Sequence, residues 1–279
     1  MRDPATWGRQ EAFRRGWAFL YPHFRGPNNT PEGCGSDLAV QDIVDAVEYA
    51  KAHLRIDARR IYLLGGSGGG HMALLMAGRH PEIWAGVYAA CPITDIARWY
   101  RESKDPERNL WPHYGDMIAR CCGGTPDERA DEYVRRSPLT HLSAARSVPV
   151  DIITGVHDGH RLHKGGGSVP CGHAIRAFNC LAREDDRLSD CQIGEIERTQ
   201  CVPSNLAFSG TSPFFSRENA ILLRIPSGNV RLTLFDAGHA GNYREGAEWL
   251  SHQRKGELAT WSYGKGSASD GEEVKEITK

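Results

Sequence analysis

The chain has 279 residues, of which 40% are hydrophobic and 25% charged, and its formal net charge is −1 at pH 7. These values are ordinary for a globular protein, and the length suits one large α/β domain or two small ones. The near-zero charge gives no sign of a nucleic-acid partner or of an acidic membrane surface. No apolar run approaches the roughly 20 residues of a transmembrane helix, and residues 1–20 lack the layout of a signal peptide.

The eight cysteines are irregularly spaced and include no C-x-x-C pair. Structural zinc is therefore not expected. Since a chain of this length can bury a core without disulfides, we expect mostly reduced thiols and a cytoplasmic location. A bridge between Cys191 and Cys201 is the alternative.

In the first part of the chain, apolar runs alternate with polar loops. The aromatic run at 16–24 predicts a buried strand, and the Gly/Pro/Asn-rich stretch 24–35 predicts a loop. Ser36 is a predicted N-cap, because apolar residues follow it at helical spacing. A second strand is predicted at 60–64, followed by a glycine cluster and a helix that ends near Arg79.

The later elements continue the alternation. Strands are predicted at 84–91, 148–155 and 229–236, and helices at about 168–181 and 241–253. The long polar insertion at about 183–218 is expected to cap a site as a lid or to form a dimer contact. Strands alternating with helices indicate an α/β fold with a mostly parallel sheet and helices on both faces. We expect one domain over residues 1–260 and a disordered tail over 261–279.

The glycine cluster has the pattern of a nucleophile elbow. Residues 65–69 read Gly-Gly-Ser-Gly-Gly, which matches G-x-S-x-G between a predicted strand and a predicted helix. Such a tight turn leaves no room for side chains, which explains Gly65 and Gly69. It holds the Ser67 hydroxyl at a helix N-terminus, where free N–H groups favour negative charge. Gly68 N–H is the expected oxyanion donor, and a flexible glycine loop is the alternative.

A nucleophilic serine needs a base, and the base needs an acid that orients it. In this type of fold they follow in the order Ser, Asp, His. Asp158 and His239 each come just after a predicted strand, at the edge where open α/β sheets place their sites. We therefore predict Ser67 as nucleophile, Asp158 as acid and His239 as base.

Other residues compete for these roles. Asp95 also follows a strand, but Asp158 is preferred, and Asp236 is too near His239 and is expected to make a loop contact. His71 and His173 lie on predicted helices, where packing is the simpler interpretation.

A metal site is the alternative for one polar cluster. The cluster His157, Asp158, His160 and His163 has metal-ligating side chains, but no second acidic cluster accompanies it. We expect no metal and no cofactor.

Several stretches resemble the catalytic domain of the prolyl oligopeptidase family, within the α/β-hydrolase fold. The resemblance covers most of residues 10–255 and lies in residues 15–29, 36–53, 57–96, 135–181 and 232–241. It implies the roles already assigned from the residues themselves: Ser67 as nucleophile, Asp158 as acid and His239 as base.

The chain departs from the family pattern in two ways. No blade-length repeats of a β-propeller are present, so it resembles related acyl-ester hydrolases, such as acetyl xylan esterases, as much as peptidases. The fold also has an earlier strand between those predicted at 16–24 and 60–64, with a loop that supplies a second oxyanion donor. Residues 1–15 resemble the helix after it. We hypothesise that the N-terminus is shortened, that the two strands pair directly, or that another segment or chain fills the slot.

The expected activity is that of a serine hydrolase. We favour an ester substrate; the alternatives are a peptidase of short peptides and an impaired hydrolase-fold binding protein. The expected partner is a small ester or short peptide, with no nucleic acid or membrane and with a homodimer left open. The predicted pocket residues, for which ordinary loop packing is the alternative, are Arg25, Asn28, Asn29, Trp99 and Tyr100.

Overall fold

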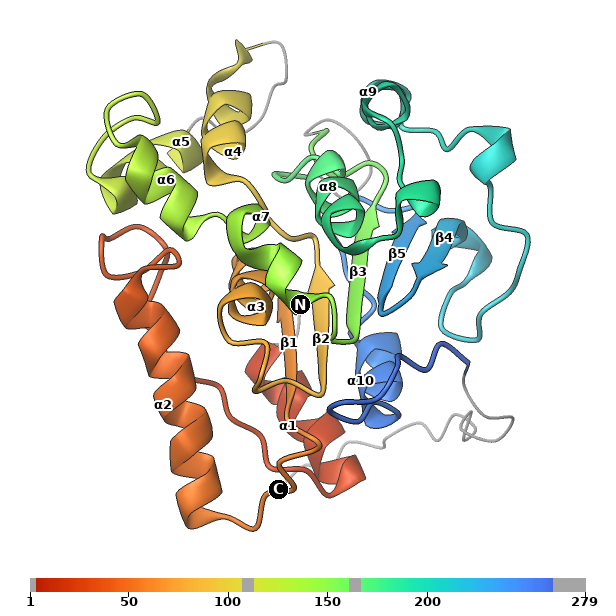
Figure 1. The fold of residues 1–279 in the computed structure, drawn as a ribbon. Helices are drawn as coiled ribbons and strands as arrows, with labels where there is room; N and C mark the ends of the chain where they lie inside the picture. The colour runs from red at the N-terminus through yellow and green to blue at the C-terminus, as the bar shows by residue number, and fades with distance from the viewer. Residues whose placement is uncertain (1–3, 107–112, 161–166, 263–279) are drawn as a thin grey trace, which may run out of the picture.

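A computed structural model describes residues 4–106, 113–160 and 167–262 (Figure 1). It contains a five-stranded sheet in the order β1-β2-β3-β5-β4. The strands are β1 (Tyr62–Gly66), β2 (Gly86–Ala90), β3 (Val150–Gly155), β4 (Ile221–Ser227) and β5 (Val230–Phe235). Neighbouring strands are parallel except for β4, which pairs antiparallel with β5. The predicted mostly parallel α/β sheet is confirmed.

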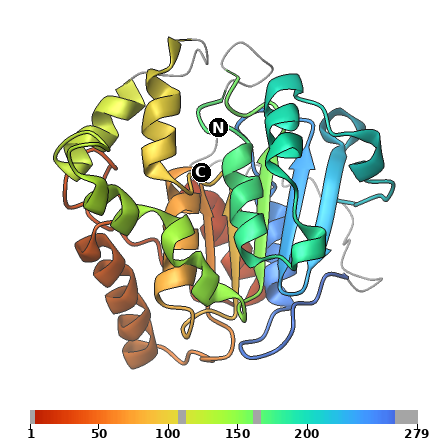
Figure 2. The ribbon, with the colours of Figure 1, turned by 45° about the horizontal axis from the view of Figure 1, so that its top comes forward.

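Helices cover both faces of the sheet. Figures 1 and 2 show α2, α3, α7 and α8 on one face and α1 and α10 on the other. Their bounds are α1 (Pro4–Arg15), α2 (Asp37–His53), α3 (Gly68–Arg79), α7 (Pro138–His141), α8 (Gly172–Leu181) and α10 (Tyr243–Ser251). The larger apolar core lies under α3 and α8, and a smaller one surrounds Trp249 of α10. Both cores pack against β2 and β3, which are interior strands of the sheet and are buried throughout.

The remaining helices lie above or beside the sheet. They are α4 (Ile96–Lys104), α5 (His113–Cys122), α6 (Ala130–Arg136) and α9 (Asp190–Thr199), with 3-10 turns at Leu142–Ala145, Glu184–Asp186, Ser204–Leu206 and Arg217–Asn219. Figure 1 shows α4, α5 and α6 above the carboxyl end of β1 and β2. The helix α9 belongs to the predicted 183–218 insertion and packs on α8. A lid role for this insertion stays a prediction.

Local sequence signals place several elements well. The Ser36 hydroxyl accepts a hydrogen bond from Ala39 N at 3.1 Å and caps α2, as predicted.

The hairpin of β4 and β5 was missed, although its signal is present. Two apolar runs flank Gly228, which adopts a φ of 58°, and a two-residue Gly-Asn connection is typical of hairpins. Pro226 fits there because β4 is an edge strand, where one missing N–H is tolerated.

The strand predicted at 16–24 is wrong. These residues are irregular, and Phe19, Leu20 and Tyr21 are 38%, 39% and 64% exposed. Within the described residues no strand pairs with β1 on the side away from β2. A strand needs a neighbour for its N–H and C=O groups, and without one the aromatic run does not form the pleated ladder. The predicted direct pairing of the two segments is therefore also wrong.

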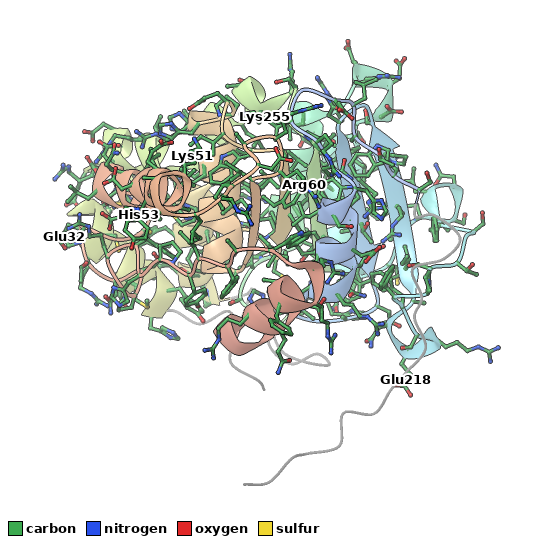
Figure 3. The ribbon with its side chains drawn as sticks, turned by 90° about the horizontal axis from the view of Figure 1, so that it is seen from below. Glu32, Lys51, His53, Arg60, Glu218 and Lys255 are labelled. Atoms are coloured by element: carbon green, nitrogen blue, oxygen red, sulfur yellow. The ribbon has the colours of Figure 1, made fainter. Side chains whose placement is uncertain are left out.

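A cavity of about 370 Å³ lies where the two segments fail to meet. It is bounded by residues 16–20 and 22, by the apolar side of α2 and by Leu63 and Leu64 of β1. Arg60 lines this cavity, whereas Lys51 and His53 are exposed on different sides of α2 (Figure 3).

Two further expectations concern the whole chain. All eight cysteines are free thiols, so Cys191 and Cys201 form no bridge. Over the described ranges, no helix combines the length and the apolar character needed to cross a bilayer. The tail predicted to be disordered lies outside the described residues from 263 onward.

Candidate active site

Ser67 occupies a strained turn between β1 and α3. Its φ and ψ are 56° and −120°, a backbone conformation that residues with a side chain rarely adopt. The turn is held by Ser67 N, which donates to Ala90 O at 2.9 Å, and by His71 N, which donates to Ser67 O at 2.9 Å. The Ser67 side chain makes no capping hydrogen bond to α3. The hydroxyl is therefore presented at the carboxyl edge of the sheet instead of being used to start the helix.

Close backbone approach explains some of the glycines in this turn, but not all those predicted. A Cβ at Gly65 would overlap the carbonyl of Gly69, and one at Gly66 would overlap the Tyr243 hydroxyl. A Cβ at Gly70 would lie 2.6 Å from Ala90 O. Among the described residues, nothing lies within 4 Å of a Cβ placed on Gly69 itself. The steric explanation for Gly69 is wrong because that position faces open space.

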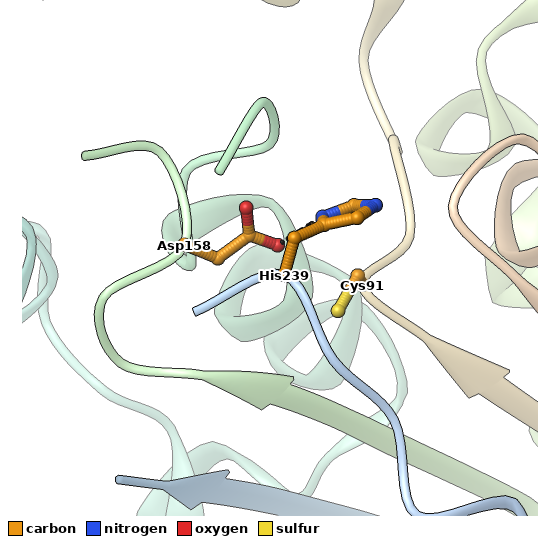
Figure 4. Close-up of side chains that lie close together, drawn as sticks. All are labelled: Cys91, Asp158 and His239. Atoms are coloured by element: carbon orange, nitrogen blue, oxygen red, sulfur yellow. Dashed lines mark hydrogen bonds and ion pairs between the residues drawn. The ribbon is translucent and has the colours of Figure 1, made fainter. Parts of the chain in front are cut away.

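Asp158 is completely enclosed in the turn that follows β3. Its Oδ1 accepts hydrogen bonds from Gly159 N at 2.9 Å and from Ser168 N and Val169 N at 3.1 Å each. Its Oδ2 accepts from His239 Nδ1 at 2.7 Å (Figure 4). With Nδ1 as the donor, the second nitrogen of the imidazole carries the lone pair that can accept a proton.

The environment of His239 works in two directions on its pKa. Burial lowers the pKa of the imidazole, but the hydrogen bond and negative charge of Asp158 raise it and outweigh burial. The imidazolium is therefore favoured next to Asp158, which is what a catalytic base needs once it has taken a proton.

Cys91 is a neighbour that the sequence interpretation did not single out. Its thiol donates to Ala240 O at 3.0 Å, and its Sγ lies in one cluster with Asp158 and His239, all ligand atoms within 4.8 Å (Figure 4). Burial raises the pKa of this thiol, so it stays protonated near neutral pH. These three residues could ligate a metal, but a protonated thiol and a carboxylate already bonded to the imidazole fit a proton-transfer site better. The available signal was a cysteine directly after a strand.

The structure links Ser67 to this cluster through the backbone. Ser67 N donates a hydrogen bond to Ala90 O, and the residue after Ala90, Cys91, lies beside His239. Among the hydrogen bonds of the described residues, none joins the Ser67 hydroxyl to His239. In proteins without bound substrate such catalytic hydrogen bonds are often long and tighten later.

The competing acids have other partners. Asp95 caps α4 by accepting from Arg98 N at 2.9 Å. Asp236 Oδ1 lies 2.9 Å from His157 Nε2. Each carboxylate is thus engaged away from His239.

Three competing histidines are engaged with polar partners. His71 is buried with its Nε2 2.8 Å from Arg136 O, and burial lowers its pKa to about 4. His173 Nε2 lies 3.1 Å from Glu102 Oε2, and His160 Nε2 lies 2.8 Å from Glu197 O. The fourth residue of the considered metal cluster, His163, lies outside the described residues. His71 and His173 pack as expected.

A cavity of about 200 Å³ opens beside Ser67. Its polar end carries Ser67, Gly68 and Asn28. Its wall is mostly apolar and is formed by Cys34, His71, Ile93, Ile96, Trp99, Tyr114, Met117, Ile118 and Ser168.

Of the predicted pocket residues, Asn28 and Trp99 line this cavity. The Trp99 ring is held by Nε1, which donates to Ser168 O at 2.6 Å. Arg25 instead pairs with Asp42 through two 2.8 Å hydrogen bonds.

The other two predicted pocket residues make their contacts elsewhere. Asn29 N donates to Pro27 O at 2.8 Å inside the loop. Tyr100 packs edge-on against Tyr133 with ring centroids 6.1 Å apart.

Comparison with known proteins identifies the family. Residues 7–194 match the model of the prolyl oligopeptidase family, which covers more than half of the chain. The chain belongs to the prolyl oligopeptidase family. This confirms the resemblance and, at the level of the family, the predicted α/β-hydrolase fold and class of serine hydrolase.

The relatives are distant, and most are longer. An acylamino-acid-releasing enzyme of Mus musculus is 26% identical over 184 residues, covering 61% of this chain and 24% of the relative. The uncharacterized peptidase YtmA of Bacillus subtilis (strain 168) is 30% identical over 147 residues, covering 52% of this chain and 53% of the relative. The chain thus spans between about a quarter and a half of the length of these two relatives.

Solved structures are also similar to this chain. The acylaminoacyl peptidase of Pyrococcus horikoshii shares 18% identity with a TM-score of 0.43, covering 57% of this chain and 22% of that one. A puromycin hydrolase shares 19% identity with a TM-score of 0.42, covering 52% and 19%.

Proposed function

We propose that this protein is a serine hydrolase that cleaves a carboxylic ester, or the amide bond of a short peptide, through an acyl-enzyme on Ser67. The observation that carries the proposal is the 2.7 Å hydrogen bond between Asp158 and His239 at the sheet edge that also presents Ser67 in a strained turn. Three distant parts of the chain meet there, and each supplies the residue type that acyl transfer requires.

The proposed reaction has two steps. His239 takes the Ser67 proton while the serine oxygen forms a bond to the substrate carbonyl carbon, and the resulting oxyanion accepts a hydrogen bond from Gly68 N–H. Asp158 stabilises the imidazolium, which then gives its proton to the leaving alcohol or amine as the ester or amide bond breaks. Water next attacks the acyl-enzyme with His239 again as base, and this releases the acid and regenerates Ser67.

The cavity beside Ser67 suggests a small apolar acyl group or side chain. Its volume is about 200 Å³, and its mostly apolar wall includes Ile93, Ile96 and Trp99. Relatives named acylamino-acid-releasing enzymes release, by that name, acylamino acids. Substrates with a short acyl chain are therefore the first to test, esters before amides.

A second function is a binding protein with a hydrolase fold. It is favoured by the lack of a hydrogen bond between the Ser67 hydroxyl and His239 among the described residues. Such a protein would bind the same class of ligand in the cavity but would not form an acyl-enzyme.

A fluorophosphonate probe separates the two functions, because it labels only a serine activated by a base. We expect the wild type to be labelled, Ser67→Ala to be unlabelled and Ser251→Ala, on the other side of the sheet, to be labelled like the wild type. Short-chain p-nitrophenyl esters compared with acylaminoacyl p-nitroanilides then rank ester against amide. An unlabelled wild type would favour the binding protein.

The cellular setting is also part of the proposal. We retain a cytoplasmic location, which is supported by the eight free cysteines. The oligomeric state, with a homodimer left open, is tested by light scattering.

A further inference from the structure

The side chain of Asn28 is fixed at one end only. Its Oδ1 accepts a hydrogen bond from Cys34 N at 2.9 Å. This bond determines which way the amide faces, because an asparagine amide has one acceptor end and one donor end. The Nδ2 end is therefore directed away from Cys34.

The free end of this amide lies against the residue after the proposed nucleophile. Asn28 Nδ2 is 2.6 Å from the position that a Cβ on Gly68 would occupy. The approach is possible only because residue 68 has no side chain. Among the hydrogen bonds of the described residues, none uses Asn28 Nδ2 as a donor, and Asn28 is half-buried in the wall of the cavity that contains Ser67.

We propose that Asn28 Nδ2 is the second donor of the oxyanion hole and acts together with Gly68 N–H. This inference rests on the proposed function. Two donors that flank one point can both face the oxygen that becomes negative when Ser67 attacks a carbonyl. Asn28 is a neutral donor, so it stabilises that oxygen without adding a positive charge next to His239.

The loop does not need Asn28 Nδ2 for its own conformation. The buried Arg136 donates to Gly33 O at 2.9 Å, to Pro31 O at 3.0 Å and to Cys34 O at 3.3 Å. Arg136 Nε is in turn paired with Glu132 Oε2 at 2.9 Å. The loop is thus held by contacts that do not involve Asn28 Nδ2, which leaves the amide donor available for a ligand.

Asn28→Asp is the decisive variant. It keeps the oxygen that accepts from Cys34 N, so the loop bond survives, but it replaces the donor with a carboxylate oxygen. We expect kcat for a p-nitrophenyl ester to fall by at least about 10² to 10³, the usual cost of one oxyanion donor, with a much smaller change in KM. Asn205→Asp is the matched control, because it makes the same chemical change at an exposed position far from the cavity; it should retain wild-type kcat.

Gly68→Ala provides a second test that leaves the Asn28 loop intact. Its methyl group would displace the amide while Gly68 N–H is kept, so kcat should fall in the same direction. Thermal unfolding of all variants separates a folding defect from a catalytic one. The inference is overturned if folded Asn28→Asp, or folded Gly68→Ala where the former does not fold, has wild-type kcat. A wild type that is neither active nor labelled contradicts the proposed function instead.

Discussion

The carboxyl edge of the sheet and the open flank of β1 differ sharply in how fully their side chains are buried and hydrogen-bonded. At the carboxyl edge of the sheet, Asp158 is only 1% exposed and both of its oxygens have donors. On the flank of β1 a cavity of about 370 Å³ opens, and Tyr21 is 64% exposed. The acid of the site is therefore held by several contacts at once, whereas the side chains of the flank are not.

This difference separates two kinds of structural information. The site is fixed by several independent contacts, namely backbone donors, a strained turn and glycines that permit close approach, and the bond between Asp158 and His239 joins distant segments. The flank depends on a neighbouring strand, because hydrogen bonding across a sheet is not local in sequence. Variants of the two regions should accordingly have very different effects.

The largest effect is expected at Asp158. Asp158→Asn should lower kcat by about 10⁴, because the amide cannot hold His239 in the required tautomer. Since the carboxylate raises the pKa of His239, its loss should also shift the acidic limb of the kcat/KM profile to lower pH. Esterase rates across pH measure both effects.

Asp236→Asn is the control for that experiment, because Asp236 is bonded to His157. It should leave both kcat and the acidic limb close to those of the wild type. Equal effects of the two substitutions would mean that the site is not specified by the Asp158 contact.

A large stability effect is expected inside the sheet. Arg231 on β5 makes a two-pronged ion pair with Asp151 on β3, with distances of 3.0 and 2.6 Å, and both side chains are buried. Arg231→Met leaves Asp151 buried with its partner removed, which should lower the free energy of unfolding by about 3–5 kcal/mol. Urea unfolding measures it, and Asp151→Leu combined with Arg231→Met should recover much of the loss. No recovery would show that the ion pair is not the cause.

A pH effect of intermediate size is expected from His71. Burial lowers its pKa to about 4 in the folded protein, while the unfolded chain titrates near the ordinary 6.5. Between these values the unfolded state binds more protons, so acidification favours unfolding. The free energy of unfolding should fall by up to about 1.4 kcal/mol per pH unit from 6.5 toward 4. His71→Gln should flatten this slope in urea unfolding at several pH values, and an unchanged slope would contradict the assignment.

The smallest effect is expected on the β1 flank. Tyr21→Ser removes an exposed ring from the irregular segment, so the free energy of unfolding should change by less than about 0.5 kcal/mol. Leu232→Ala, in the buried centre of β5, is the matched core variant and should cost about 2–5 kcal/mol. If Tyr21→Ser were as costly as Leu232→Ala, the flank would be packed in solution, and the contrast between the two regions would fail.

Much of the fold could be predicted because its signals are local. The Ser36 cap and the apolar spacing of α2 lie within a few residues of each other, and the Ser67 turn lies between a short apolar strand and a helix. The hairpin before β5 was missed although Gly228 marks it, because no element was predicted between the insertion at 183–218 and the strand at 229–236.

The errors have non-local causes. Residues 16–24 have the composition of a strand, but composition cannot supply the partner strand that a ladder requires. Gly69 follows the elbow pattern, yet only the tertiary structure shows that it faces open space while Gly66 meets Tyr243. Cys91 and the donor end of Asn28 likewise became visible only when distant loops were placed side by side.

The sequence by itself indicated the alternation of strands and helices that holds β1, β2, β3 and β5, the turn at Ser67, and Asp158 and His239 as its candidate partners. It could do so because periodicity, capping and turn chemistry act over a few neighbouring residues. Only the tertiary structure decided that Asp158 and His239 touch, that Cys91 lies beside them and that the Asn28 amide approaches Gly68. Those contacts join segments far apart along the chain, and their distances are set by how whole strands and loops pack.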